Sequence, residues 1–374
     1  MYALLFVAGC GDDSDKNEGS STHSVHEDHD GGHEDHDGGI GDGHDDGHSE
    51  SDTGHGHDHG GMVMGGDPPP PKEDLLPEKL SETGLYADIL AKSIDPEFLH
   101  FTPQFQLWSD GADKQRWAHI PEGTSIDSTD MNNWSVPVGS KFFKEFSIDG
   151  RRIETRLIQR VGTGPRDFAY VSYQWNADET EAIKVSPAGI ENVSGTMHDI
   201  PSKLLCLRCH GTHPLGGGRA SRMLGFSAIQ LSHTETENSL DDLADTLSDP
   251  PDSAYTVPGD ADTQAALGYL HANCGSCHHA ESDRIPQVNL ALWLNVEATT
   301  VEETDAWKTA VSHDNALFND QHVVARIAPG NAEESSVIYR MSQRGNTAQM
   351  PPLGTEVKDE TGIATVEAWI RSLP

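Results

Sequence analysis

The sequence predicts an α+β protein with a disordered N-terminal tether, an antiparallel β-rich domain and a mainly α-helical C-terminal domain. Three observations predict this class. Residues 11–74 contain almost no large apolar side chains, residues 75–196 alternate apolar and polar positions, and residues 256–374 contain apolar stripes at helical spacing. Two further segments, residues 1–10 and 197–255, complete the 374-residue chain.

The first ten residues end in an apolar run that closes on Gly9 and Cys10. This pattern is similar to the lipobox of bacterial lipoproteins, in which the cysteine is acylated, although no basic residue precedes the run. We therefore predict a truncated lipoprotein signal with a true start upstream of Met1. The alternative is that Cys10 is an ordinary residue. Because the run is too short to cross a bilayer, membrane attachment would come through the lipid on Cys10 alone.

Residues 11–74 are dominated by Gly, Asp, His and Ser, and too little apolar surface is available to offset the entropy of ordering. The segment is therefore predicted to be disordered, with a stiff polyproline end at Pro68–Pro71. Neutral imidazoles among carboxylates can bind zinc, copper or nickel weakly. The alternative role is a hydrated tether. The ten histidines are His23, His26, His29, His33, His36, His44, His48, His55, His57 and His59.

The chain has 25 Lys and Arg against 61 Asp and Glu, a formal net charge of −36. This charge argues against nucleic-acid binding and against electrostatic attachment to anionic lipid. It favours protein partners with basic docking surfaces.

Residues 75–196 are predicted to form several short antiparallel strands. Phe146 and Ile148 alternate with polar neighbours, and Asp149-Gly150 fits a type I′ hairpin turn before Ile153. A second hairpin is expected around the turn at residues 176–178. The segment 108–113 is expected to be an Asp/Gly turn, with a cation-binding loop as the alternative. The tryptophans expected to fill the core are Trp108, Trp117, Trp134 and Trp175.

Two copies of C-x-x-C-H are the most informative motif in the chain. They are Cys206-Leu207-Arg208-Cys209-His210 and Cys274-Gly275-Ser276-Cys277-His278. This spacing is the attachment signature of a c-type haem, in which both thiols add to one porphyrin and the histidine ligates the iron. The alternatives are a C-x-x-C redox pair or a zinc site made by the four thiolates, and neither explains a histidine after both pairs. We predict two covalently bound haem c groups.

The first haem-binding segment, residues 197–255, is expected to enter a helix at Pro201 with Ser202 as N-cap. The sixth iron ligand of this haem stays open, with Met223 preferred and an empty sixth position as an alternative. The other candidates are His198, His213, His233 and Met341.

In residues 256–374, a helix beginning near Thr263 is expected to present Cys274, and a C-terminal helix to bury Ile363, Val366 and Ile370. A further helix is expected to be capped by Asn331.

Met350 is followed by two prolines, so this methionine cannot lie inside a helix. An extended loop could bring its sulfur to the iron opposite His278. An exposed loop methionine is the alternative.

The order of attachment helix, Met-Pro loop and terminal helix resembles that of monohaem bacterial cytochrome c domains. From about Leu80 onward, the chain resembles a family of bacterial dihaem c-type cytochromes of uncharacterised role. The segments that resemble the family are 107–111 (LWSDG), 136–139 (VPVG), 153–156 (IETR) and 268–274 (GYLHANC). The likeness covers about four fifths of the chain and implies no known substrate.

These features favour an electron carrier at the cell envelope over a catalyst. Haem c attachment outside the cytoplasm and the lipid signal together predict a periplasmic or surface location, on the outer membrane of a Gram-negative bacterium. One alternative is a dihaem enzyme resembling bacterial cytochrome c peroxidases, which needs an acid/base residue that no sequence feature identifies. The other is an envelope lipoprotein that binds metal through its histidine tract.

Overall fold

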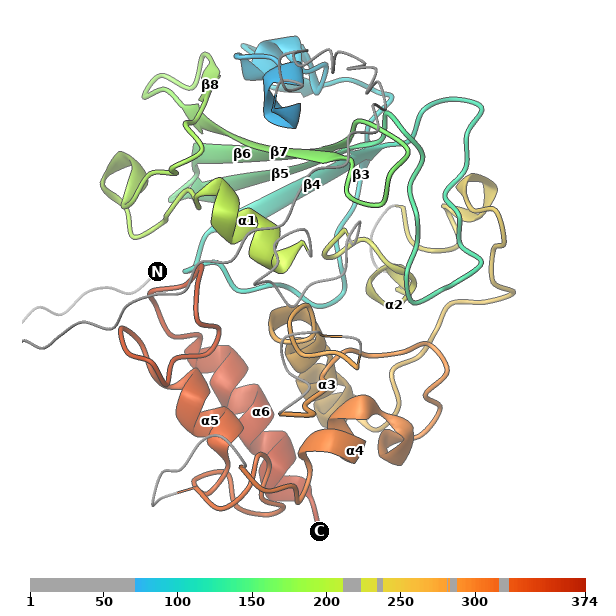
Figure 1. The fold of residues 1–374 in the computed structure, drawn as a ribbon, viewed down its shortest axis with the longest axis vertical. Helices are drawn as coiled ribbons and strands as arrows, with labels where there is room; N and C mark the ends of the chain where they lie inside the picture. The colour runs from blue at the N-terminus through green and yellow to red at the C-terminus, as the bar shows by residue number, and fades with distance from the viewer. Residues whose placement is uncertain (1–70, 211–222, 234–237, 281, 283–287, 316–322) are drawn as a thin grey trace, which may run out of the picture. The chain divides into compact units, whose positions relative to one another are not determined.

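The computed structural model describes residues 71–210, 223–233, 238–280, 282, 288–315 and 323–374 (Figure 1). Cys10, the ten tether histidines and His213 lie outside the described residues, so the predictions made for them stay predictions. Residues 67–374 form one compact unit. Among the residues described, no helix is both long and apolar enough to cross a membrane.

The predicted α+β class is confirmed by the described residues, which contain eight antiparallel strands and six α-helices. The strands are β1 Tyr86–Asp88, β2 Ser93–Ile94, β3 Leu99–His100, β4 Asp113–His119, β5 Lys141–Ile148, β6 Arg151–Arg160, β7 Phe168–Trp175 and β8 Ala182–Lys184. The α-helices are α1 Lys203–Cys209, α2 Ala228–Leu231, α3 Ala261–Asn273, α4 Asp305–Ala310, α5 Ser336–Met341 and α6 Glu360–Ser372. Five short 3-10 turns are η1 Lys72–Leu75, η2 Leu80–Glu82, η3 Val193–Gly195, η4 Ala244–Thr246 and η5 Val301–Glu303.

Strands β3 to β8 pair in sequence order as one antiparallel sheet. The predicted hairpin joins β5 to β6, and both Asp149 and Gly150 have positive φ, 51° and 75°, as a type I′ turn requires. The second predicted hairpin joins β7 to β8. Both faces of the central strands pack on apolar neighbours, so burial along β5 and β7 does not strictly alternate.

One face of the sheet is covered by the N-terminal turns. Trp117, Phe143, Leu157 and Tyr173 lie on this face and pack with residues such as Leu80 of η2. Residues 72–74, before the predicted boundary at residue 75, already belong to the folded part, because η1 packs on β7. Helix α1 also packs on β7, and it lies on the opposite side of the sheet in Figure 1.

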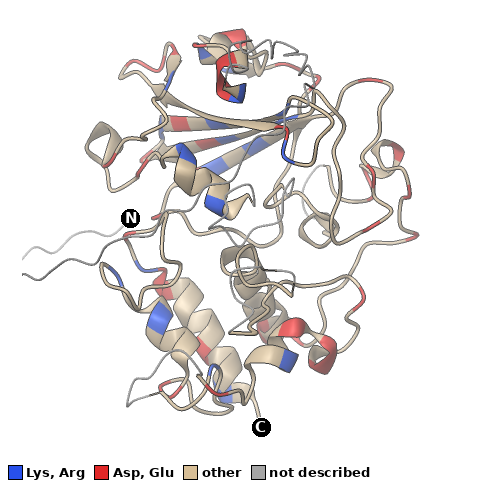
Figure 2. Cartoon of the chain, in the orientation of Figure 1, with Lys and Arg blue, Asp and Glu red and all other residues tan. Residues whose placement is uncertain are grey.

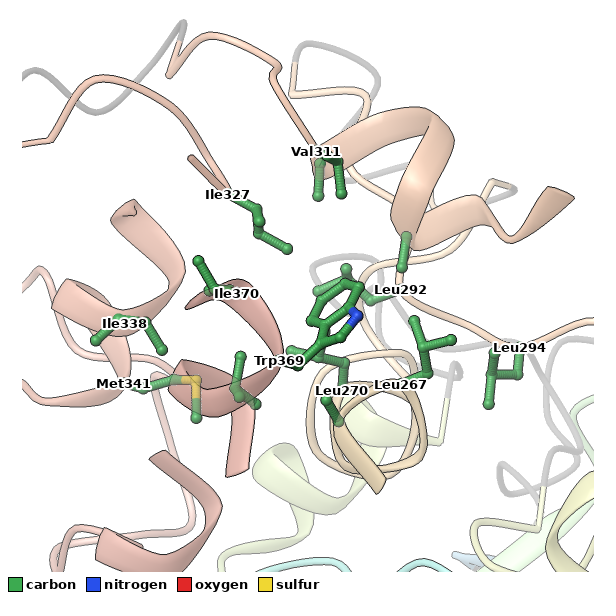
Figure 3. Packing of buried hydrophobic residues seen from close by; sticks show 14 of the residues in the cluster. Leu267, Leu270, Leu292, Leu294, Val311, Ile327, Ile338, Met341, Trp369 and Ile370 are labelled. Carbon is green, nitrogen blue, oxygen red and sulfur yellow. The ribbon is translucent and has the colours of Figure 1, made fainter. Parts of the chain in front are cut away.

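The C-terminal core is built around the contact of α3 with α6. Trp369 of α6 is fully buried and points toward Leu267 and Leu270 of α3 (Figure 3). At Gly362 a Cβ atom would lie 2.1 Å from the Tyr269 ring, so the two helices approach closely there. The described residues do not show a mainly α-helical C-terminal part, because α4 and α5 have only six residues each and long loops connect them.

Several helix boundaries differ from the predicted ones. Helix α3 begins at Ala261, because the Asp260 side chain accepts a hydrogen bond from the Thr263 N–H and caps the first turn. Asn331 caps no helix: α5 begins at Ser336, and the Asn331 side chain instead accepts from the nearby Glu334 N–H. Ser202 is the N-cap residue of α1, although its side chain makes no capping hydrogen bond.

Candidate functional site

The first C-x-x-C-H motif lies at the end of α1. Cys206 and Cys209 are partly buried, and the His210 N–H donates to the Cys206 carbonyl at 3.1 Å, which continues the helical turn. The ring of Tyr170, on β7, lies 5.4 Å from the His210 ring, centroid to centroid. Helix α1 therefore holds the predicted iron ligand against the sheet.

The second motif follows directly from α3. The Cys274 N–H donates to the Leu270 carbonyl at 2.9 Å, and the His278 N–H donates to the Cys274 carbonyl at 2.9 Å. Gly275 is required here, because a Cβ atom would lie 2.6 Å from the His271 carbonyl oxygen. Both motifs thus form compact turns that keep two thiols and one imidazole together.

His278 is buried in a way that suits an iron ligand. Its Nδ1 atom is buried and has no hydrogen-bond partner among the described residues. Burial, with the nearby positive charge of Arg340, lowers the pKa of His278 to about 4. The imidazole is therefore neutral at neutral pH, which is the form that binds a metal.

A cavity of about 680 Å³ adjoins both motifs. Cys206, Cys209 and His210 of the first motif line it, as do Ser276 and Cys277 of the second, whereas Cys274 and His278 are not among the lining residues. This volume lies within the range of about 300–1,000 Å³ that is usual for sites of cofactors and other small molecules. A second hollow, of about 860 Å³ beside Arg151 and Trp175, contains no residue of either motif.

The four motif cysteines are free thiols in buried surroundings. Burial, followed by the neighbouring Cys277, raises the pKa of Cys209 to about 12, and burial with Cys277 raises the pKa of Cys274 to about 12. Cys209 and Cys277 line the same cavity, so the two motifs are close neighbours. Within the described part of the chain, no group of three or more His, Cys, Asp or Glu side chains has an arrangement that could hold a metal ion.

The loop that contains Met350 borders the same cavity. Pro351, Pro352 and Leu353 line it, whereas Met350 is partly buried and is not among the lining residues. The Met350 N–H donates to the Arg340 carbonyl at 3.0 Å. The structure therefore brings the loop to the cavity but does not test Met350 as the ligand opposite His278.

The loop at residues 108–113 anchors this Met-Pro loop. The predicted turn is confirmed, since the Ala112 N–H donates to the Ser109 carbonyl at 2.9 Å. The Asp110 carboxylate accepts from the Thr355 hydroxyl at 2.7 Å and from the backbone N–H groups of Glu356 and Val357. The turn predicted from Asp and Gly spacing thus holds a segment more than 240 residues away in sequence.

Trp108 was expected in the core, and this expectation is wrong. Its side chain is only partly buried and lines the cavity. Its backbone N–H donates to Asn273 Oδ1 at 2.7 Å, and its indole Nε1 donates to the Val357 carbonyl at 2.9 Å. Trp108 therefore links the end of α3 to the Met-Pro loop, while Trp117, Trp134 and Trp175 are buried as expected.

The candidate sixth ligands of the first haem differ in their surroundings. Met223 and His198 line the cavity together with His210. His198 Nε2 lies 2.7 Å from Glu154 Oε2, so this nitrogen already has a partner. His233 Nε2 lies 2.7 Å from the Thr102 carbonyl oxygen, and Met341 is packed in the C-terminal core. The preference for Met223 stays a prediction.

Glu154 is a fully buried carboxylate beside the cavity. The Arg156 guanidinium donates to both of its oxygens, at 2.7 and 2.8 Å. Burial raises the pKa of Glu154, but the charge of Arg156 and the hydrogen bonds from Arg156 and His198 outweigh it and hold the pKa at about 2. The carboxylate is therefore ionised throughout the neutral range.

Glu154 should make the free energy of unfolding decrease at acidic pH. The carboxylate keeps its charge in the folded protein down to about pH 2, whereas the unfolded chain takes up the proton below about pH 4.5. Its contribution of about 3 kcal/mol is therefore complete above pH 4.5 and is lost as the pH falls through 2. Urea unfolding across this range should show this loss in the wild type and not in Glu154→Gln. The exposed control Glu122→Gln should show the same pH dependence of the unfolding free energy as the wild type. An equal pH dependence in all three proteins would contradict the role given to Glu154.

One functional feature was not found from the sequence. Arg116, Lys144 and Arg156 line the cavity from three neighbouring strands. A signal was present, because Lys144 occupies the same strand face as the buried Phe142 and Phe146. Its meaning depends on the strand register, which the sequence alone does not provide.

No family model, no curated protein and no solved structure matches the chain. The likeness to dihaem c-type cytochromes therefore rests on the motifs and enters below as a proposal.

Proposed function

We propose that this chain is a dihaem c-type cytochrome that transfers electrons between redox partners at the cell envelope. The observation that supports this most directly is that both C-x-x-C-H motifs adjoin one cavity, with Cys209 and Cys277 near enough to influence each other. Two porphyrins attached there would be close neighbours, as a relay of electrons requires.

The residues present suit two haem c groups. Each motif offers two thiols without a disulfide and a histidine held in the same turn. When bound, each group supplies a one-electron iron couple. The chain's own residues attach the porphyrin through Cys206, Cys209, Cys274 and Cys277, and ligate the iron through His210 and His278.

The C-terminal part is proposed to be a cytochrome c domain. Helix α3 presents Cys274, the Met-Pro loop follows, and α6 packs on α3 to close the core. Met350 is proposed as the second protein ligand of the iron that His278 would hold. With both residues bound, the iron would have no position left for a substrate and would supply electron exchange alone. Basic partners would dock on this acidic chain, which we place at the outer membrane through a lipid on Cys10.

Spectra of the full-length protein, purified from a host that attaches haem c, test this proposal. Two thioether-bound haems per chain are expected by mass, and the optical and EPR spectra of both redox states should identify the sixth ligand at each iron. A purified protein with the mass of the bare chain would overturn the proposal.

Met350→Ala should leave both haems attached and lower the midpoint potential of one centre. Thioether ligation raises the potential of haem iron, so its loss favours the oxidised state. We expect a decrease of at least about 59 mV, which is a tenfold change in a one-electron equilibrium. Potentiometric titration measures both centres. The exposed Met197 provides the control, and two unchanged potentials in Met350→Ala would show that Met350 is not the ligand.

A second candidate function is a dihaem peroxidase-like enzyme. The observation that favours it is His198, which lines the cavity with His210 and whose ring is held by the Glu154 carboxylate. A histidine beside an open iron position could act as the acid/base residue that such a reaction needs. A high-spin EPR signal from the first haem, together with peroxide turnover that His198→Ala abolishes, would favour the enzyme over the relay.

A further inference from the structure

Three cations lie side by side across the face of the sheet that borders the cavity. Arg116 on β4 is directly opposite Lys144 on β5, and Lys144 is directly opposite Arg156 on β6. We call these three residues the cationic row. Figure 2 shows basic residues along these strands, although the chain as a whole has a net charge of −36.

The cationic row separates two apolar clusters on this face. Ala118, Phe142 and Tyr170 belong to one cluster, and Phe146 and Ile153 belong to the other. The row therefore lies between apolar clusters, on a face that also carries Glu154 and Ser172. Packing of the apolar clusters does not by itself require three cations there.

The row has too few negative partners. Arg156 pairs with Glu154, whereas within the described part of the chain the Arg116 guanidinium donates to the neutral Gln106 side chain, at 3.0 Å. Lys144 contacts the Phe146 ring, with its Nζ 4.8 Å from the ring centroid. Neither Arg116 nor Lys144 forms an ion pair with a carboxylate among the described residues.

Such an arrangement is costly without a ligand. Like charges directly opposite each other destabilise a sheet, and a buried charge needs a partner to offset its lost hydration. Burial, and then the neighbouring Arg116 and Arg156, lower the pKa of Lys144 well below its usual range. Burial also lowers the pKa of Arg116 to about 10. A bound anion would relieve both effects.

The row lies close to the first motif. Tyr170, which contacts His210, precedes Ser172 by two residues on β7, and Ser172 is directly opposite Arg156. Two residues along a strand span about 7 Å. Lys144, Arg156 and Cys209 also line the same cavity. A ligand attached at Cys206 and Cys209 would therefore have its polar edge within reach of the row.

We propose that the cationic row binds the two propionate carboxylates of the haem attached to Cys206 and Cys209. Within the row, Arg116 and Lys144 have no carboxylate partner among the described residues, and the porphyrin has two carboxylates to offer. The row then orients the porphyrin in the cavity and holds positive charge near the iron, which favours the reduced state. This inference rests on the proposed function, because it assumes that haem occupies the first motif.

Charge-removing variants of the full-length, haem-loaded protein test the row. Lys144→Met and Arg116→Gln should each keep both haems by mass and lower the potential of one centre by about 59 mV, a tenfold change in its reduction equilibrium. The affected centre should be the one that disappears in a variant without Cys206 and Cys209. Infrared difference spectra with isotope-labelled propionates should show a shifted carboxylate band in the same variants.

Two control variants distinguish the loss of charge in the row from a general folding defect. Lys144→Arg preserves the charge and should restore the wild-type potential and band. Arg151→Gln removes an exposed cation from β6 and should change neither.

The outcomes distinguish the two proposals. Absence of haem in the wild type ends the proposed function. Two attached haems with unchanged potentials and bands in Lys144→Met and Arg116→Gln overturn the propionate assignment alone. A potential that responds to the row only when phosphate or nitrite is added also overturns it, since the row would then be a site for free inorganic anions.

Discussion

Replacing Cys206 and Cys209 with serine should remove one covalently bound haem and leave the other in place. Serine is close in size to cysteine but cannot form the thioether, so the loss should come from chemistry and not from packing. Both positions are only partly buried, and α1 keeps its backbone hydrogen bonds without the sulfur atoms. The mass of the purified chain should decrease by one haem, and the visible absorbance should fall by about half.

The paired replacement Cys274→Ser with Cys277→Ser should remove the other haem. Each variant would then display a single centre, so the potential and spectrum of each haem can be measured alone. Cys10→Ser lies outside both motifs. By the proposal it removes the lipid anchor, but it should still retain both haems. A variant without Cys206 and Cys209 that still had two haems would contradict the assignment of the first motif.

Trp369→Ala should cause the largest loss of stability among the substitutions considered for the C-terminal core. The side chain has no exposed surface and packs between α6 and α3, with Leu267 and Leu270 beside it (Figure 3). Removing a buried tryptophan leaves a large cavity and costs about 3–5 kcal/mol. Urea unfolding of the full-length protein, followed by circular dichroism, measures this loss.

Two matched variants test whether the stability loss of Trp369→Ala comes from lost apolar volume. Trp369→Phe keeps most of the apolar volume and removes the indole N–H, which has no hydrogen-bond partner among the described residues, so its cost should be clearly smaller. Arg371→Ala, also on α6, breaks an exposed ion pair with Glu333 and should cost less than about 1 kcal/mol. Equal losses in Trp369→Ala and Arg371→Ala would contradict the proposed core.

Sequence patterns predicted the parts of the fold that depend on interactions between residues close together in the chain. The Asp149-Gly150 turn was predictable because few residue pairs tolerate positive φ at both positions. The stripe of Ile363, Val366 and Ile370 was predictable because one helix face must be buried. The start of α5 was predicted wrongly, because the Asn331 side chain accepts a hydrogen bond within a turn and does not cap a helix.

Trp108 and Asp110 illustrate what local patterns could not predict. An aromatic residue in a β-rich segment is usually buried, yet Trp108 lines the cavity because its two N–H groups bond to Asn273 and Val357. Asp110 was recognised only as part of a turn. Its role in holding the Met-Pro loop depends on residues far along the chain.

The sequence by itself determined the pairs of thiols, the histidine beside each pair and the strands of the sheet, because these depend on spacing over a few residues. Tertiary structure alone decided that Cys209 lies near Cys277, and that Arg116, Lys144 and Arg156 form one row facing the cavity. The reason is physical. Strand register and the packing of α1 on the sheet are set by contacts between residues distant in sequence, and a shift of one residue would turn the cationic row to the opposite face.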